Sequence, residues 1–478
     1  MGSKGLSERL SKRLSERLSK WLSMSLSMPL SKGFQRATGQ PAVSLGLILL
    51  GALALRGLAL WLSLDTPLAG DEPEYFARAV RRVLGPPGID GSGRAPGAIA
   101  LYAGAFEIGG VSVTAARLVN VLASSLTVLP AYWLGRAWGG VGAGLLGALG
   151  VALYPNFIAF SHFLWSEPLF LLWVASALAG LVSGRGPLAW GRVAGAGALL
   201  ALAALTKESG VVFLPLVAAW VAWKTWPEGR ALALARATLL LLVAAAALAP
   251  RVAEVNGPGL PPALITRTGA MNLFIGNHPV SHFRGMHEYP GLAATPLAAE
   301  RVARARALEE IRRRLPAWPL EKLAHEGPRF FTPTSFAIRR LLAPAGEPGG
   351  WRYQLRLPMG EAPIFRGFLV AGVVAAYVGV LLAGAAGWLL ARRRDLSALF
   401  GLFLLAQIGP SIVMFSMSRF RLPSMLFFIL GAAVLALHGR QDWAAASGLR
   451  KGLVLGIVTG LLVCLGLDYD SVLGSSGH

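Results

Sequence analysis

Long apolar runs recur along this chain of 478 residues, and they restrict its fold more than any other feature. A helix needs about 20 apolar residues to cross ~30 Å of hydrocarbon, whereas the alternating ten-residue segments of membrane barrels are not visible here. Hydrophobic residues make up 54% of the chain and charged residues 14%, which excludes an ordinary soluble enzyme. We therefore expect an all-α, polytopic membrane protein. About eleven spans are expected, at 42–64, 114–134, 141–160, 164–182, 191–206, 209–225, 231–250, 364–390, 396–415, 421–438 and 452–467.

Basic residues fall in alternate short connections between these spans, which predicts the orientation of the chain. The basic connections are at 136, 185–192, 224–236, 392–394 and 440–451. Because cytoplasmic loops carry an excess of Lys and Arg, these connections and the N-terminus are expected in the cytoplasm. Residues 65–113 and 251–363 are then outside. Most of the net charge of +21 is explained by this topology and by anionic lipid, so it does not indicate a nucleic-acid partner.

The same pattern predicts the domain organisation. It comprises a basic cytoplasmic tail at 1–41, a transmembrane module at 42–250, an extracytoplasmic segment at 251–363, C-terminal helices at 364–467 and a tail at 468–478. A tetrapeptide repeat in the first 33 residues places Leu at every fourth position. It is either a basic interfacial helix on anionic lipid or a low-complexity expansion. The single cysteine, Cys464, excludes an intrachain disulfide and a cysteine metal cluster.

Residues able to do chemistry collect on the expected outer side, at or near the membrane boundary. They are Asp71, Glu72, Glu74, Glu167, Lys207, Glu208, His278, Arg419 and Arg421. A transporter is expected instead to place ionisable groups inside its spans near the midplane, and few are found there. The shared sidedness of the polar residues predicts one extracytoplasmic site.

The first acidic cluster has a structural and a functional interpretation. Asp71 as N-cap and Glu74 at the third helical position form a capping box for a surface helix that runs to about Leu84. Capping accounts for Asp71 and Glu74 but not for Glu72. Adjacent carboxylates at the membrane boundary are also suited to hold an acceptor hydroxyl or a divalent cation.

Six short motifs follow one another in order on the expected outer side. They are GDEPEYF at 70–76, ARLVN at 116–120, SHFLWSEPLF at 161–170, LTKESG at 205–210, GNHP at 276–279 and SRFRLP at 418–423. With them the chain resembles the polyprenyl-phosphate-sugar-dependent membrane glycosyltransferases of the glycosyltransferase C superfamily, which include the family 39 protein O-mannosyltransferases and aminoarabinose transferases. The chain departs from the family pattern at two places, which bear on the identity of the donor sugar and of the acceptor. Arg94-Ala95-Pro96-Gly97 replaces a Lys-Pro-Pro-like stretch, and Asn277-His278-Pro279 replaces Asn-Asn-Pro.

The resemblance implies roles for individual residues. Asp71 is the expected catalytic base, with Glu72 orienting it or sharing a metal ion. Lys207, Arg419 and Arg421 are expected to bind the donor phosphate, because a leaving phosphate needs positive charge as the sugar bond breaks. Acceptor or metal positioning is assigned to Glu167 and His162, further loop contacts to Tyr75, Glu208 and His278, and a possible divalent cation to Asp71 and Glu167.

Several of these residues also have simpler explanations. Lys207 and Arg421 are placed to extend to lipid headgroups, and Glu167 to cap its helix. His278, His282 and His287 suggest zinc, but their spacing does not put them on one helix face. Amphipathic helices expected at 300–315 and 328–342 either wall a groove for the polyprenyl chain or only cover the bundle.

The favoured function is that of an enzyme on the outer face of a prokaryotic plasma membrane. It transfers a sugar from a polyprenyl-phosphate donor to a protein, glycolipid or polysaccharide acceptor. A base and a leaving phosphate on opposite sides of the anomeric carbon predict inversion. The alternatives are a carrier or flippase of lipid-linked sugars, which predicts two related halves, and a nonenzymatic envelope assembly factor.

Overall fold

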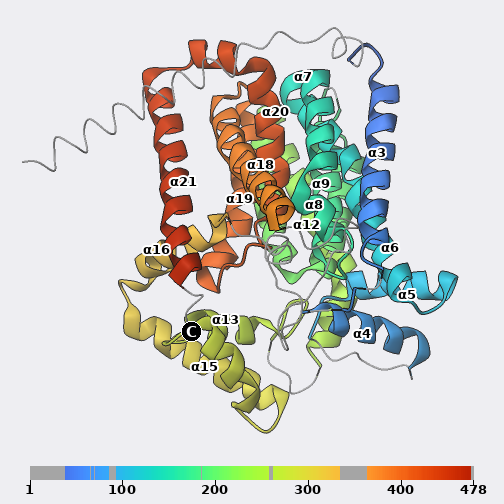
Figure 1. Ribbon diagram of the computed structural model, residues 1–478, viewed down its shortest axis with the longest axis vertical. Helices are drawn as coiled ribbons and strands as arrows, with labels where there is room; N and C mark the ends of the chain where they lie inside the picture. The colour runs from blue at the N-terminus through green and yellow to red at the C-terminus, as the bar shows by residue number, and fades with distance from the viewer. Residues whose placement is uncertain are drawn as a thin grey trace, which may run out of the picture.

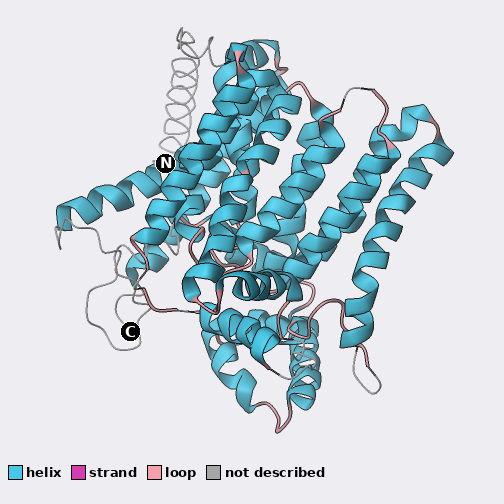
Figure 2. Cartoon of the chain, turned by 90° about the vertical axis from the view of Figure 1, so that its right-hand side faces the viewer, coloured by secondary structure: helices cyan, strands magenta, loops and turns pink. Residues whose placement is uncertain are grey.

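The structure is a computed structural model that describes residues 38–64, 66–68, 70–85, 93–184, 186–257, 262–333 and 363–474. Every regular element in these ranges is a helix, which confirms the expected all-α fold (Figure 2). The tetrapeptide repeat lies outside the described residues, as does most of the amphipathic helix expected at 328–342. The domain boundaries remain predictions.

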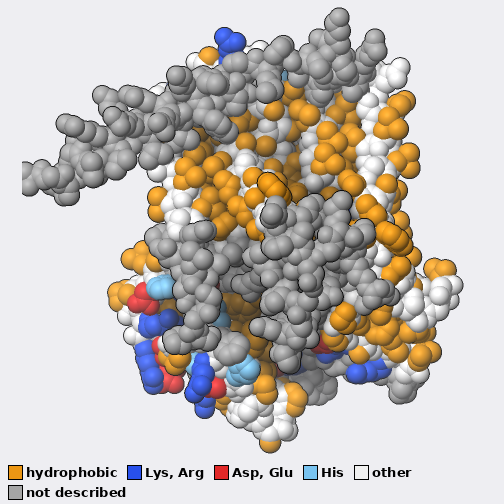
Figure 3. Space-filling model, in the orientation of Figure 1, with side chains coloured by type: hydrophobic (Ala, Val, Ile, Leu, Met, Phe, Trp, Pro, Cys, Tyr) orange, Lys and Arg blue, Asp and Glu red, His pale blue; other side chains and the backbone are white. Residues whose placement is uncertain are grey.

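The longer helices run side by side as a bundle (Figures 1 and 2). They are α3 (Pro41–Trp61), α6 (Val113–Leu126), α7 (Val128–Leu153), α9 (Glu167–Val182), α10 (Trp190–Thr206), α11 (Phe213–Thr225), α12 (Arg230–Val255), α18 (Pro363–Leu390), α19 (Arg394–Val413), α20 (Leu422–Ala445) and α21 (Gly448–Gly474), with α8 (Pro155–Phe160), η1 (Glu208–Val212) and η2 (Trp226–Glu228) between them. Hydrophobic side chains cover the flank of this bundle, a surface suited to lipid (Figure 3). The chain is a multi-pass membrane protein.

Eight described segments are long and apolar enough to cross a membrane. The spans expected at 164–182 and 191–206 correspond to the shorter apolar helices α9 and α10. The span expected at 114–134 falls within the single apolar segment Val113–Leu153, and the one expected at 141–160 begins in this segment and extends into α8. The expected number of spans therefore remains a prediction.

The segment Val113–Leu153 folds back on itself inside α7. Gly139 and Gly140 have non-helical backbone angles, and Gly140 has a φ of 81°, which favours glycine because it has no Cβ. A Cβ on Gly144 would lie 2.7 Å from the carbonyl oxygen of Tyr132, so the arms on either side of the reversal pack closely. Each arm holds one of the two spans that the hydropathy pattern predicts.

The remaining helices lie against one end of the bundle (Figure 1). The first loop supplies α4 (Glu72–Leu84) and α5 (Pro96–Gly109), and the long segment supplies α13 (Gly269–Asn277), α14 (His282–Glu288), η3 (Tyr289–Gly291), α15 (Pro296–Arg314) and α16 (Trp318–Phe331). The surface helices expected up to Leu84 and over 300–315 are thus present. Charged and histidine side chains gather at this end (Figure 3).

The basic connections meet at the opposite end. Lys224, in the last turn of α11, pairs with Asp395 at the start of α19 at 2.5 Å. Arg393 donates to the carbonyl oxygen of Ala137, at 3.3 Å, close to the reversal in α7. Contacts between segments so distant in sequence show that the connections expected on one side do lie at one end of the bundle.

Candidate functional site

A cavity of about 2620 Å³ is lined by residues of the bundle end, the first loop and the long segment. Small-ligand pockets usually measure roughly 300–1,000 Å³, so this cavity has room for a larger ligand or for two ligands. Its wall is partly apolar, from residues such as Val212, Met271 and Phe415. Residues singled out in the sequence that line it include Asp71, Glu74, Tyr75, Glu167, Lys207, Glu208, His278, His282 and Arg419.

Asp71 lies at the N-cap position of α4 but makes no capping hydrogen bond. Its Oδ1 accepts from Arg94 Nη2 at 2.9 Å, and its Oδ2 accepts from Arg419 Nη1 at 2.6 Å. Glu74 also accepts from Arg94, at 2.7 Å, and pairs with Arg78. The capping-box interpretation is therefore wrong, because both carboxylates bind guanidinium groups, which are stronger partners than a backbone N–H.

The two guanidinium groups set the charge of Asp71. Burial alone raises the pKa of this carboxyl, but Arg419 and Arg94 outweigh it and lower the pKa to about 2. Asp71 is therefore ionised at any physiological pH. Because the pKa is lowered on folding, the resulting stabilisation is complete above about pH 4 and is lost as the pH falls through about 2.

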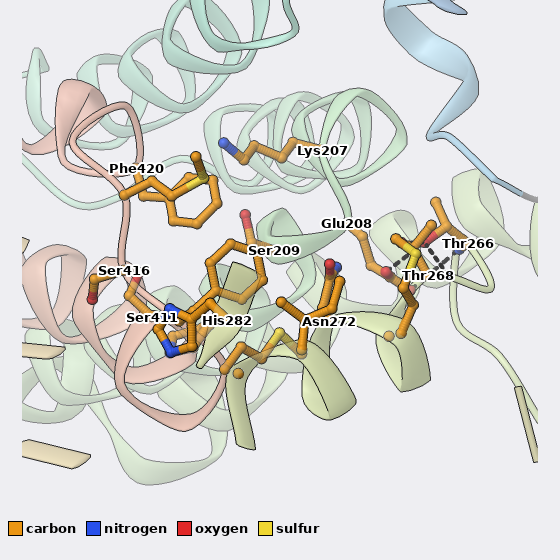
Figure 4. A pocket seen from close by; sticks show the side chains of 18 of the residues that line it. Lys207, Glu208, Ser209, Thr266, Thr268, Asn272, His282, Ser411, Ser416 and Phe420 are labelled. Atoms are coloured by element: carbon orange, nitrogen blue, oxygen red, sulfur yellow. Dashed lines mark hydrogen bonds between the residues drawn. The ribbon is translucent and has the colours of Figure 1, made fainter. Parts of the chain in front are cut away.

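A second ion pair lies beside the first. Glu167, at the first position of α9 and 4% exposed, accepts from Lys207 Nζ at 2.8 Å. Lys207 follows the last residue of α10, where the extended backbone turns into η1. Lys207 Nζ lies 5.0 Å from the centre of the Phe420 ring, and Arg419 Cζ lies 5.5 Å from the same centre. Both cations therefore face one aromatic side chain, and each is paired with a carboxylate in the cavity wall. Figure 4 shows Lys207 and Phe420 on the same side of the cavity.

Arg419 is contacted by aromatic rings as well as by Asp71. Its Cζ lies 5.0 Å from the centre of the Trp165 ring, close enough for a cation–π contact. Trp165 belongs to the connection between α8 and α9, and Arg419 to the turn between α19 and α20. The site is thus assembled from connections that are far apart in the sequence, and aromatic rings pack against the arginine.

Glu72 points away from this cavity. It is fully buried, and its Oε1 accepts from the backbone N–H of Leu164 at 3.0 Å and lies 3.9 Å from Arg117 Nη2. Arg117 in turn donates to the carbonyl oxygens of Ser63 and Thr66, after α3. Successive residues at a helix start point in different directions, so Asp71 and Glu72 do not act as an adjacent pair. The contacts of Glu72 join α4 to the bundle.

His162 and Arg421 are likewise buried outside the cavity lining. The ring of His162 packs on Phe163. Arg421 donates to the carbonyl oxygen of Phe330 at 3.2 Å, near the end of α16, and its Cζ lies 4.2 Å from the centre of the Tyr377 ring. Arg421 therefore ties α20 to α16 and α18, and it does not reach the lipid headgroups.

Glu208 and His278 line the cavity, but their hydrogen bonds are to the segments around it. Glu208 accepts from the Thr266 backbone N–H at 3.2 Å and from its hydroxyl at 2.5 Å, as the dashed lines in Figure 4 show. His278 Nε2 lies 3.1 Å from Glu288. These bonds link Glu208 to the segment before α13, and His278 to the end of α14.

The two carboxylates assigned to a possible divalent cation are paired with basic side chains. Among the described residues, no three His, Cys, Asp or Glu side chains are grouped as metal ligands. Asp71 and Glu167 direct their oxygens to Arg94, Arg419 and Lys207, and such cations oppose a further positive charge. The expected cation remains a prediction.

A buried network that the sequence reasoning missed connects the long segment to the turn before Arg419. Lys322 Nζ, in α16, donates to the carbonyl oxygens of Gly276 at 2.8 Å and Met414 at 2.7 Å. It also lies 3.3 Å from Glu326, whose other oxygen accepts from the backbone N–H of Ser416 at 2.8 Å. The four-residue spacing of Lys322 and Glu326 was the one feature of the sequence that could have indicated this ion pair. The same spacing is also common on exposed helices, so it does not by itself predict a buried pair.

Gly276 allows the close approach on which this network depends. A Cβ at this position would lie 1.9 Å from the carbonyl oxygen of Met414, so any side chain here would displace the turn. Asn277 Nδ2 adds a hydrogen bond to the carbonyl oxygen of Val413 at 3.1 Å. The end of α13 thereby fixes the end of α19, from which the turn carries Arg419 to Asp71.

Comparison with known proteins agrees with this architecture. The profile of a family described as dolichyl-phosphate-mannose-protein mannosyltransferase matches residues 93–253. The archaeal oligosaccharyltransferase AglB from Archaeoglobus fulgidus, solved with an inhibitory peptide and a dolichol-phosphate, is similar over 90% of this chain, with 16% identity and a TM-score of 0.50. The resemblance to the polyprenyl-phosphate-dependent membrane glycosyltransferases is confirmed. The apo Archaeoglobus fulgidus oligosaccharyltransferase gives 17% identity and a TM-score of 0.51.

The similarity to these membrane glycosyltransferases concerns the fold. The chain spans 55% of the length of the Archaeoglobus fulgidus oligosaccharyltransferases it matches. ArnT from Cupriavidus metallidurans, bound to undecaprenyl phosphate, matches over 84% of this chain and 78% of its own, with 16% identity and a TM-score of 0.39. No curated protein sequence matches the chain.

Proposed function

We propose that the protein transfers a sugar from a polyprenyl-phosphate donor to an acceptor nucleophile in this cavity. The observation that supports this most is the paired arrangement of Asp71 with Arg419 and Glu167 with Lys207 around Phe420. It puts carboxylates for proton transfer next to cations for a phosphate, in a cavity with room for both substrates. The oligosaccharyltransferase with a similar fold was solved with a dolichol-phosphate, which corresponds to the lipid phosphate that leaves in the proposed reaction.

In the proposed reaction the bond between the anomeric carbon and the phosphate oxygen breaks, and polyprenyl phosphate leaves with the electron pair. Lys207 and Arg419 neutralise the charge that develops on this phosphate. The acceptor oxygen bonds to the anomeric carbon from the opposite face, and its proton passes to Asp71. The sugar is inverted, and Asp71 returns its proton to water when the products leave.

We further propose that the cavity opens on the extracytoplasmic side of a prokaryotic plasma membrane. The basic connections lie at the opposite end of the bundle, where the positive-inside rule puts the cytoplasm. The sugar donor and acceptor then meet outside the cell, at the membrane surface.

Donor binding should depend on Lys207. We expect Lys207→Gln to weaken the binding of a short-chain polyprenyl phosphate by about 10- to 100-fold, because a charge-assisted hydrogen bond to phosphate is lost. Titration calorimetry of the purified protein in detergent measures this. The control is Lys224→Gln, the same change at an ion-paired lysine at the other end of the bundle, which should bind as the wild type does. Equal affinities for both variants would place the phosphate elsewhere.

Donor binding should also activate Asp71. A phosphate that binds Arg419 competes with Asp71 for the guanidinium group. The pKa of Asp71 then rises from about 2, because the positive charge that lowers it is partly neutralised. The pH dependence of kcat/KM reports the free enzyme, in which Asp71 is ionised. Protonation of Asp71 should therefore cause no fall in kcat/KM above about pH 4. In kcat, which reports the complex, an acid limb should appear at higher pH, because protonated Asp71 cannot accept a proton. Identical limbs in kcat and kcat/KM would contradict this coupling.

A further inference from the structure

Three neutral polar side chains form a buried strip on the α19 side of the cavity. Gln407 and Ser411 are four residues apart on one face of α19, and Ser416 lies in the following turn. They are 7%, 5% and 8% exposed, and all three line the cavity. Figure 4 shows Ser411 and Ser416 in the part of the wall that also holds His282.

Two hydrogen-bonding atoms of this strip lack a partner. Gln407 Nε2 and Ser416 Oγ are buried without a hydrogen bond to any described residue. Ser411 Oγ donates to the carbonyl oxygen of Gln407 at 3.0 Å, which leaves its own lone pairs available. A buried donor without a hydrogen-bond partner lowers the stability of the fold by about 1–3 kcal/mol. The same applies to a side-chain amide in a membrane helix. Such groups are accounted for when a ligand supplies the missing partners.

The chemistry of the strip indicates which kind of ligand. An amide and two hydroxyls, set between Ala406, Pro410 and Met414 in the cavity wall, match groups that both donate and accept hydrogen bonds. Sugar hydroxyls have this property, and a polyprenyl chain does not. The strip itself contains no cation, and the nearby carboxylate of Glu326, which accepts from the Ser416 backbone N–H, already pairs with Lys322, His282 and Arg329. A sugar bearing a carboxylate would therefore lose its hydration at the strip without gaining an ion pair.

The strip is also placed between the elements that carry the charged site. α19 packs against η1, which follows Lys207, and Ser416 is three residues before Arg419. A sugar attached to a phosphate held by Lys207 and Arg419 therefore has a hydrogen-bonding wall available on α19.

We propose that Gln407, Ser411 and Ser416 form the subsite for the donor sugar and that this sugar is uncharged and rich in hydroxyl groups. The inference rests on the proposed function and adds the position and chemical class of the sugar. Gln407 is the specificity-determining residue of the subsite, because its amide donor has no other partner among the described residues.

Calorimetry with two ligands tests the subsite separately from the phosphate site. The ligands are a short-chain polyprenyl phosphate and the same lipid carrying mannose. We expect the wild type to bind the mannosylated lipid more tightly, and Gln407→Leu to reduce that advantage by about 3- to 10-fold, the effect of one neutral hydrogen bond. Affinity for the sugar-free lipid should stay within about twofold, since the phosphate cations are unchanged. A glucuronosyl lipid should bind less tightly than the mannosyl lipid.

Thermal unfolding supplies a second readout. Gln407→Leu replaces an unpaired buried amide by an apolar side chain of similar size, so its Tm should equal or exceed that of the wild type. The matched control is Gln441→Leu, at the exposed cytoplasmic end of α20, which should bind both lipids as the wild type does.

The outcomes distinguish the two proposals. If Gln407→Leu and Ser416→Ala keep the full advantage of the mannosylated lipid, or if Gln407→Leu lowers the Tm and weakens both lipids equally, the subsite is wrong and the phosphate site stands. If the wild type binds neither lipid, the proposed function fails and the subsite fails with it.

Discussion

Replacing Asp71 by Asn is expected to lower kcat by about 10²–10⁴-fold, the usual contribution of a general base. Asn keeps the size of the side chain but cannot accept the proton of the acceptor. Arg94 and Arg419 then lose their neutralising partner, so affinity for polyprenyl phosphate should hold or rise. Turnover with a labelled lipid-linked sugar and calorimetry with the sugar-free lipid measure the two effects.

Asp395→Asn is a closely matched control for this variant. Asp395 also binds two cations, Arg393 and Lys224, but it lies at the other end of the bundle. It should retain wild-type turnover. If Asp71→Asn, with a normal Tm and normal lipid binding, turns over within about threefold of the wild type, Asp71 is not the base.

Replacing Lys322 by Met is expected to cost about 3–5 kcal/mol of stability, the usual result of removing one member of a buried ion pair. Lys322 and Glu326 are 4% and 2% exposed, so Glu326 would keep a buried charge with one cation fewer. The carbonyl oxygens of Gly276 and Met414 would also lose a donor. Reversible unfolding in mixed detergent micelles measures the change, and turnover should fall because the turn that carries Arg419 is released.

Lys224→Met makes the same substitution at a lysine that is 40% exposed. It should lower the free energy of unfolding by less than about 1 kcal/mol, because surface ion pairs contribute little to stability. Two variants with equal stability losses would show that the Lys322 network does not brace the turn. Glu326→Gln gives an independent check, because it keeps the shape of the side chain and removes its charge.

The membrane fold and the grouping of the site could be predicted from sequence because both depend on local patterns. Hydropathy located the apolar helices, and loop charge correctly put distant connections such as those at Lys224 and Asp395 at one end. Ordering of the motifs on the other side then predicted that Asp71, Glu167 and Lys207 share a site, and all three line one cavity.

Side-chain direction could not be predicted in the same way. Glu72, His162 and Arg421 belong to the same motifs as residues that line the cavity, yet each is buried against helices far away in sequence. A motif gives residue types and spacing, but the face on which each side chain lies depends on how its helix packs.

The sequence by itself determined that this is a helical membrane protein with its reactive groups at one end, because the cost of placing polar groups in hydrocarbon acts on each segment separately. Only the tertiary structure decided which charges meet. Asp71 and Arg419 are 348 residues apart, and their contact depends on a turn that Gly276, Lys322 and Glu326 hold in place. Such a contact exists only once the long segment has packed against the bundle, and no local pattern specifies it.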